Sequence, residues 1–342
     1  MRSIEMCQCQ LSSFPNHVQV PSLKDIQCAS IRLQPYIKRT EFIFSPRLAH
    51  RSGHNIFLKR EDQQEIRSFK VRGALNKMLS LSKNQKQTGV VCASAGNHAQ
   101  GFAFACHLLG IQGVVFLPQN TPEQKVRQVK YYGKNNVRVV IFGSNFDHAC
   151  QKALEYTQET GKVFVHPFDD PDVIAGQATI ALEMISDQKR ALDVLLVPVG
   201  GGGLVSGVSL VYKSLSPQTR VLGVEVEGAE AMHTSLAQQR RIRLNSLDLF
   251  ADGTAVKQVG QLPFDICRQL LDGVIVVTKK QVCEWLFSLN NDLAMIVEPA
   301  GALAVAAAMT MDQGVDLNIG CIVSGGNNDA YRYSEYERLL RA

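Results

Sequence analysis

Short apolar segments alternate with segments of helical periodicity from about residue 88 onward, and this alternation limits the possible folds more than any other feature. The apolar segments predict strands at 89–93, 114–117, 137–142, 162–165, 194–199, 221–226, 274–277 and 318–323. The segments between them predict helices at 98–109, 122–133, 146–157, 204–215 and 298–310. Such alternation is typical of a mostly parallel sheet covered by helices on both faces. We therefore expect an α/β fold.

The chain has 342 residues, more than one core usually supports, and it contains too many strands for one sheet. We expect two lobes, each a mostly parallel, open, twisted sheet with helices on both faces. A small lobe at 88–165 would be inserted into a large one made of 31–87 and 166–342. Residues 1–30 are expected to be a loosely ordered N-terminal extension, and the more polar 229–262 a surface segment.

The charge, apolar runs and cysteines of the chain limit which ligands and compartments we expect. The chain has 36 Lys and Arg against 31 Asp and Glu, and its basic residues do not cluster, which argues against nucleic acid as a ligand. No apolar run approaches membrane-spanning length, and the N-terminus lacks the apolar core of a secretory signal. Nine scattered cysteines, without a partner pair at zinc spacing, predict reduced thiols and no metal site. We expect a cytoplasmic protein, with an organellar transit peptide left open.

Lys70, in the run SFKVRGA at 68–74, is the first candidate for chemistry. A lysine amine is reactive when it can lose its proton and attack a carbonyl group. The run alone does not identify that carbonyl. The turns downstream would together suit one phosphorylated aromatic cofactor.

The second candidate is a glycine run between the strand that ends at Val199 and the helix that follows it. Glycines allow close backbone approach, and a helix N-terminus offers N–H donors, so this turn predicts a phosphate site. It lacks the GxxxxGK[ST] pattern of the nucleotide P-loop. It also fails to match GxGxxG, because Val205 and Ser206 stand where the third glycine would fall. The alternative is a flexible turn. The run consists of Gly200, Gly201, Gly202 and Gly203.

Three further motifs follow predicted strands or open predicted helices. Ser94 and Asn97 lie in SAGNHAQG, where a carboxylate site and a plain helix cap are both open. Ser324 ends the last strand, where parallel sheets bind ligands, but the SGGNND run also suits a simple turn. Glu298 opens EPAGA, which suits either close helix packing or a functional carboxylate.

These motifs occur in the same order in one family, which the chain resembles from about Tyr36 onward: SFKxRGA, SAGNHAQG, GGGGL, EPAGA and SGGN. The family is threonine ammonia-lyase (threonine dehydratase), among the fold type II pyridoxal-phosphate enzymes related to the tryptophan synthase β subunit. The segment from Asp252 to Val277 looks closest to the biosynthetic form. The resemblance implies deaminating dehydration of L-threonine to 2-oxobutanoate and ammonia, on the route to isoleucine. L-serine would be a second substrate, giving pyruvate.

The resemblance also implies a role for each matching residue. Lys70 would form the Schiff base with pyridoxal 5'-phosphate, beside Phe69, and its freed amine would remove the Cα proton of the substrate. Asn97 would bond the ring hydroxyl and Ser324 the ring nitrogen. The phosphate would be held by Gly200, Gly201, Gly202, Gly203 and Leu204. The loop that grips the substrate carboxylate would contain Ser94, Asn97 and His98. We expect a homo-oligomer, a dimer or a tetramer.

The nearest rival is serine racemase, of the same fold and cofactor. Racemisation needs a second proton carrier, which in that family is a serine at the position of Ala95. This chain also lacks part of the cation site of the racemase. Glu225 matches the first carboxylate of that site, but Ala231 stands where a second carboxylate is expected. Elimination is therefore favoured over racemisation. A catalytically silent cofactor-binding protein is the third alternative.

Biosynthetic members of the family usually continue into a C-terminal regulatory domain that binds isoleucine. This chain ends at Ala342, just after the last helix of the catalytic region. We therefore expect no regulatory domain.

Overall fold

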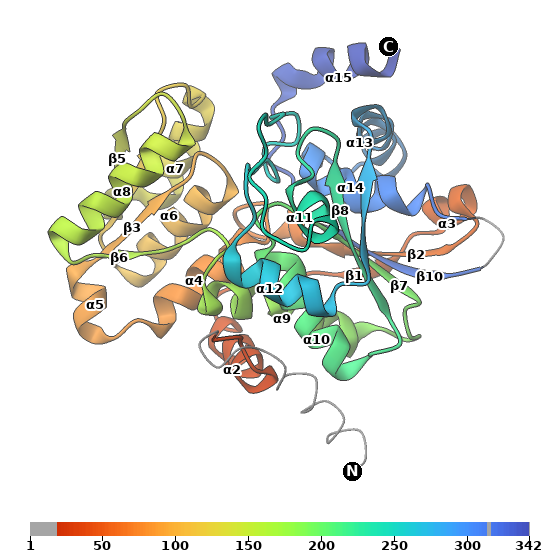
Figure 1. Cartoon of the computed structure of the whole chain (residues 1–342), viewed down its shortest axis with the longest axis horizontal. Coiled ribbons are helices and arrows are strands. Elements are labelled where there is room, and N and C mark those ends of the chain that lie inside the picture. The colour runs from red at the N-terminus through yellow and green to blue at the C-terminus, as the bar shows by residue number, and fades with distance from the viewer. Residues whose placement is uncertain (1–18, 313–315, 342) are drawn as a thin grey trace.

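Two sheets form the framework of the molecule (Figure 1), a computed structural model that describes residues 19–312 and 316–341. The larger sheet has the strand order β1-β2-β10-β7-β8-β9, with only β1 antiparallel to its neighbour. Its strands are β1 (Phe42–Phe44), β2 (Asn55–Arg60), β7 (Val194–Pro198), β8 (Arg220–Val226), β9 (Gly273–Val277) and β10 (Asn318–Val323).

The smaller sheet is parallel throughout, in the order β5-β4-β3-β6. Its strands are β3 (Val90–Ala93), β4 (Gly113–Leu117), β5 (Val137–Ile141) and β6 (Val163–Phe164). The prediction of an α/β fold with mostly parallel sheets is confirmed.

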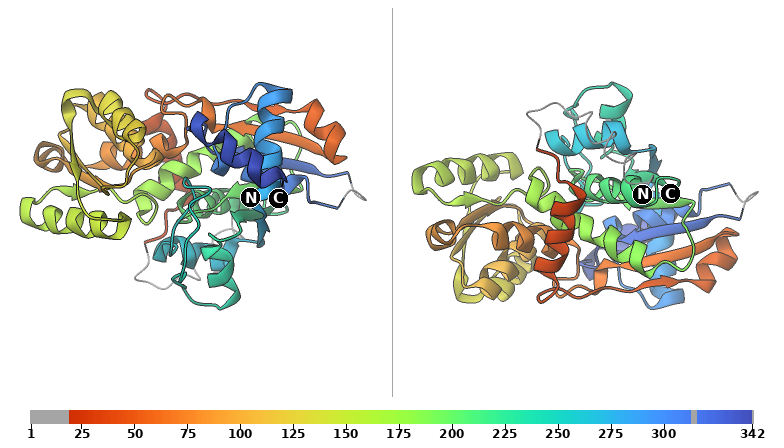
Figure 2. Two further views of the ribbon diagram at one scale, coloured as in Figure 1. Left: turned by 90° about the horizontal axis from the view of Figure 1, so that it is seen from above. Right: turned by 90° about the horizontal axis from the view of Figure 1, so that it is seen from below.

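Helices cover both faces of each sheet, as the two views of Figure 2 show. On the larger sheet, one face packs against α13 (Lys279–Leu293) and α14 (Pro299–Ala308). The other face packs against α9 (Pro171–Asp187), α10 (Gly203–Leu215) and α12 (Gln261–Leu270). Near this sheet, α3 (Pro46–Ser52) packs against β2 and α11 (Ala231–Ala237) against β9, whereas α15 (Tyr333–Arg341) packs against α13.

Along β3 of the smaller sheet, successive side chains point to opposite faces. Val90 and Cys92 join the cluster under α6 (Asn97–Leu109) and α7 (Glu123–Gly133). Val91 and Ala93 pack against α8 (Phe146–Thr160). The cluster under α6 also takes in side chains of α4 (Lys70–Ser80), and α5 (Lys83–Thr88) leads from α4 into β3. Short 3₁₀ turns in the described part of the chain are η1 (Glu61–Gln63), η2 (Lys134–Asn136) and η3 (Ala330–Arg332).

Part of the predicted N-terminal extension forms a helix, α2 (Leu23–Leu33). Ser22 caps it with a capping box that includes Asp25, and Ile26 and Leu33 are buried. The expectation of loose order is therefore wrong from Leu23 onward, because one apolar face is buried. Residues 1–18 lie outside the described residues.

The long helix α9 was missed by the sequence patterns. It is buried on most of its surface, from Val173 to Met184, against α4, α10 and α2. A helix surrounded by protein shows no apolar stripe, so periodicity does not reveal it. The helix predicted from Pro122 begins one residue later, at Glu123, because the Pro122 backbone is extended (ψ 138°).

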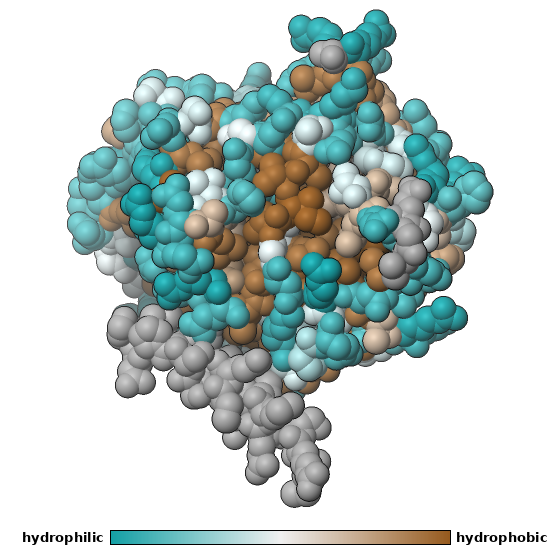
Figure 3. Space-filling view, turned by 45° about the vertical axis from the view of Figure 1, so that its right-hand side comes forward, coloured by the Kyte–Doolittle hydropathy of each residue, from teal (hydrophilic) through white to brown (hydrophobic). Residues whose placement is uncertain are grey.

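An apolar area occupies the middle of one face of the molecule (Figure 3). β9 is an edge strand of the larger sheet, and Val276 on it is 37% exposed. Leu249 is 60% exposed. Among the described residues, no helix is both long and apolar enough to cross a bilayer.

Candidate active site

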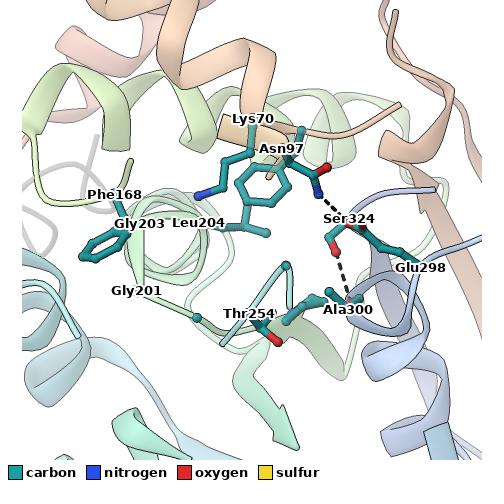
Figure 4. A pocket seen from close by; sticks show the side chains of 15 residues that line it. Lys70, Asn97, Phe168, Gly201, Gly203, Leu204, Thr254, Glu298, Ala300 and Ser324 are labelled. Carbon is teal, nitrogen blue, oxygen red and sulfur yellow. Dashed lines mark hydrogen bonds between the residues drawn. The ribbon is translucent and has the colours of Figure 1, made fainter. Parts of the chain in front are cut away.

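One pocket brings together most of the residues that the sequence singled out (Figure 4). It lies at the carboxyl ends of β7 and β10, beside the first residues of α4 and α6. Among the predicted residues, those that line it are Phe69, Lys70, Asn97, Gly200, Gly201, Gly202, Gly203, Leu204 and Ser324.

Lys70 is the first residue of α4, and backbone contacts attach the start of this helix to the end of β10. The Phe69 N–H donates to the Ser324 carbonyl at 3.1 Å, and Ser68 pairs with Gly325. The Lys70 Nζ donates to the Pro167 carbonyl at 3.0 Å. Burial lowers the pKa of Lys70 to about 8, against the opposing charge of Glu298. More of the amine is therefore free near neutral pH than in an exposed lysine.

The glycine turn before α10 leaves no room for side chains. A Cβ on Gly201 would lie 2.2 Å from the Phe168 ring, and one on Gly203 would lie 2.9 Å from the Phe168 carbonyl oxygen. Gly202 has a φ of +94°, which favours glycine. The first N–H groups of a helix have no partner within it, so the start of α10 can donate to an anion. This turn fits a phosphate group.

Asn97 and Ser324 lie in the same pocket as the amine. The Asn97 Nδ2 donates to Glu298 Oε1 at 2.6 Å, and its Oδ1 accepts from Asn327 Nδ2 at 2.8 Å. The Ser324 hydroxyl donates to the Ala300 carbonyl at 3.1 Å, which leaves its oxygen able to accept a hydrogen bond. In Figure 4 the glycine turn and Ser324 lie on opposite sides of the pocket. The donor set fits a phosphorylated aromatic ring carrying an aldehyde.

The remaining two predicted residues, Ser94 and His98, do not line the pocket. The Ser94 hydroxyl accepts from the Gly96 N–H at 3.3 Å. The His98 Nε2 lies 2.9 Å from the Val165 carbonyl, and Nδ1 is buried without a described partner. Burial, reinforced by the charge of Lys70, lowers the pKa of His98 to about 3, so the ring is neutral. Their contact with a substrate stays a prediction.

Sequence reasoning missed several residues of the pocket wall. Phe168 lies under the glycine turn, four residues after β6, in a stretch without periodicity. Thr254 packs against Gly200, where a Cβ would lie 2.9 Å from the Thr254 Cα. The small-residue motif EPAGA gave a signal for Glu298, whose carboxylate enters the pocket. Within the described ranges, no group of three or more His, Cys, Asp or Glu is placed to hold a metal ion.

The class of protein follows from this pocket together with a family comparison. The model of the pyridoxal-phosphate dependent enzyme family matches residues 33–325. That span includes Lys70, Asn97, the glycine turn and Ser324. The chain belongs to this family.

Relatives of the chain carry a more specific name. The chain is 43% identical over 320 residues to the biosynthetic L-threonine dehydratase of Halalkalibacterium halodurans, covering 93% of this chain and 77% of the relative. It is 44% identical to that of Bacillus subtilis, covering 93% and 76%.

Solved structures agree with this grouping. The processed form of threonine deaminase isoform 2 from Solanum lycopersicum superposes with a TM-score of 0.87 at 34% identity, covering 96% of this chain and 98% of that one. Maize serine racemase superposes equally well, with a TM-score of 0.87 at 34% identity, covering 94% and 99%. The fold alone therefore does not separate elimination from racemisation.

Proposed function

We propose that this chain is a lyase that converts L-threonine into 2-oxobutanoate and ammonia, and L-serine into pyruvate and ammonia. The observation that carries the proposal is the Lys70 amine in one pocket with the glycine turn, Asn97 and Ser324. The similarity to biosynthetic threonine dehydratases supports threonine as the main substrate. That similarity also supports a role in the biosynthesis of isoleucine.

Each pocket residue would have one task. Pyridoxal phosphate, when bound, withdraws electrons from the Cα of an attached amino acid. The N–H groups of the glycine turn would hold the phosphate, and Asn97 would orient the ring hydroxyl. Lys70 would hold the aldehyde of the cofactor, and its Nζ, once free, would accept the proton from the substrate Cα. The β-hydroxyl would leave with a proton as water, and hydrolysis of the resulting enamine by one water would give the keto acid and ammonia.

Ser324 favours this outcome because it is neutral. A carboxylate at the ring nitrogen would keep that nitrogen protonated and strengthen electron withdrawal. A hydroxyl imposes no such charge. Negative charge at Cα is then less delocalised and is relieved by loss of the β-hydroxyl.

Racemisation is the second candidate, and Ala95 argues against it. A racemase needs a proton carrier on the face opposite Lys70. The methyl group of Ala95, which packs against the cluster under α6, cannot carry a proton. His98, three residues on, is neutral and turned toward Val165. Lys70 is left as the proton carrier of the proposed reaction.

The test uses purified protein loaded with pyridoxal phosphate and offered L-threonine, L-serine and D-serine in parallel. We expect 2-oxobutanoate from threonine, less pyruvate from L-serine and no interconversion of the serine enantiomers. Bound cofactor without release of keto acid would support a silent binding protein instead. D-serine formation faster than pyruvate release would support the racemase.

Oligomeric state and location are also proposals. Figure 3 shows an apolar area on one face of the molecule, and such an area is a surface that a homo-oligomer would bury. We propose a homodimer or homotetramer in the cytoplasm. Light scattering after size exclusion tests the first proposal, because a monomeric mass at micromolar concentration would contradict it. Cell fractionation tests the second.

A further inference from the structure

Glu298 is a buried carboxylate that the proposed reaction leaves unused. It stands at the N-cap position of α14, where its side chain makes no capping hydrogen bond. It is 4% exposed and lines the pocket beside Asn97. None of the ion pairs among the described residues includes it. A buried carboxylate without an ion-pair partner is costly, so its presence here calls for a function.

The carboxyl group is tightly held. Its Oε1 accepts from Asn97 Nδ2 at 2.6 Å, and the Glu298 N–H donates to the Gly325 carbonyl at 3.2 Å. A Cβ on Gly325 would lie 2.4 Å from Oε1, and one on Gly253 would lie 3.3 Å from it. These two glycines leave space for the carboxylate and little freedom to move.

Glu298 also connects the two sheets. Asn97 begins α6, which packs on the smaller sheet, whereas Glu298 precedes α14 on the larger one. The same Asn97 amide accepts from Asn327, which follows β10. The orientation of the Asn97 side chain is therefore set from both sides by the larger lobe.

Burial and the surrounding charges act in both directions on the pKa of Glu298. Burial, and then the charge of Asp252, raise the pKa of Glu298 to about 7. The Asn97 hydrogen bond and the charges of Lys125 and Arg67 oppose the rise. Glu298 in turn is the one charge that opposes the lowered pKa of Lys70. The charge of Glu298 thus bears on the proton of Lys70 near neutral pH.

We propose that Glu298 is a positioning residue that orients the Asn97 amide and, through its charge, sets the pH at which the nitrogen of Lys70 holds a proton. The inference rests on the proposed function only in that Lys70 carries the cofactor. A charged carboxylate favours a proton on that nitrogen, because the proton adds positive charge nearby. A neutral side chain at 298 removes this effect.

The test measures the visible absorbance of the cofactor-loaded enzyme against pH, without substrate. In Glu298→Gln we expect the midpoint of the absorbance change to fall by on the order of one pH unit. Glu298→Asp keeps the charge and should retain most of the wild-type midpoint. The matched control is Glu155→Gln, the same substitution at an exposed position of α8, which should leave the midpoint unchanged.

An unmoved midpoint in a folded, cofactor-loaded Glu298→Gln would overturn the inference, as would a spectrum that is independent of pH in both proteins. An equal shift in Glu155→Gln would also overturn it. If circular dichroism shows that Glu298→Gln does not fold, Glu298→Ala removes the same charge and carries the same expectation. Because the readout needs no turnover, failure to release 2-oxobutanoate would sink the proposed function and leave this comparison valid.

Discussion

The amine of Lys70 ends in a buried pocket, whereas the side chain of Lys83 is exposed at the start of α5. Lys70→Ala should lower the release of 2-oxobutanoate by about 10³-fold or more, because the base at Cα is lost. Borohydride should no longer fix cofactor to the chain, as mass spectrometry can measure. Lys83→Ala is the control and should behave as the wild type. Appreciable turnover in Lys70→Ala would contradict the role assigned to this residue.

The glycine turn offers a second test of single residues. Gly201→Ala should weaken cofactor binding, because the new methyl would lie 2.2 Å from the Phe168 ring. Combining it with Phe168→Ala removes the ring and should restore part of the affinity. Fluorescence titration with pyridoxal phosphate measures both. An additive loss in the double variant would show that the clash is not the cause.

Position 95 tests the choice between reactions. Ala95→Ser places a hydroxyl where the racemases carry their second proton donor, so we expect slow formation of D-serine from L-serine. Chiral chromatography of the products measures it, with Ala95→Val as a control that lacks the hydroxyl. Absence of D-serine from a folded, cofactor-loaded Ala95→Ser would count against the argument from this position.

Among elements, α4 is fixed by a buried ionic network two residues after Lys70. The fork of Arg72 bonds Glu61 at 2.7 and 2.8 Å and Glu183 at 2.7 and 2.9 Å. Lys59 donates to the same Glu183 at 2.6 Å, so two cations face two carboxylates. The network joins β2, η1 and α9 to the helix that carries the reactive amine.

Arg72→Lys should therefore lower the free energy of unfolding by about 1–3 kcal/mol, because an ammonium keeps the charge but cannot reproduce the four hydrogen bonds of the guanidinium fork. Denaturant unfolding at pH 7 measures the loss. The matched control is Arg138→Lys. In the wild type the Arg138 guanidinium donates to the Tyr156 hydroxyl at 3.0 Å in an exposed position. This substitution should change the free energy of unfolding by less than about 1 kcal/mol. Equal effects of the two substitutions would refute the importance of the network.

The sequence contained SFKxRGA but gave no sign of what Arg72 contacts. Its partners are 11 and 111 residues away along the chain. Local patterns report on neighbours three or four residues apart, so they found α6, α7, α8, α10 and α14 on the faces of the sheets. They missed α9, whose partners surround it, and also α12 and α13.

For the whole molecule, the stability should depend on pH through Glu225, which is 1% exposed. Burial, with a further contribution from Glu230, raises its pKa to about 8, against hydrogen bonds from the Met232 and His233 N–H groups. Since the folded state then holds a proton that the unfolded chain releases near pH 4.5, stability falls as pH rises toward 8.

Between pH 6.5 and 8 this group should contribute a slope of at most about 1.4 kcal/mol per pH unit. Histidines that are buried in the neutral form also make stability depend on pH, but below that window. Their protonation destabilises the folded state as pH falls, which is the opposite of the effect of Glu225. Denaturant unfolding across the window measures the slope. It should flatten in Glu225→Gln, whose side chain cannot ionise. An unchanged slope would show that Glu225 does not hold a proton in the folded state.

The sequence by itself predicted the α/β class and the parallel strands from local periodicity, and it singled out Lys70 and the glycine turn from their motifs. The turns with Asn97 and Ser324 were open on their own residues and became site candidates through the order of the motifs, which resembles that of one family. Only the tertiary structure decided that β10, the last strand, lies between β2 and β7. That position brings Ser324 beside Lys70 and the glycine turn, and it places Glu298 against Asn97. Strand order and burial depend on contacts between segments hundreds of residues apart, and no local pattern records them.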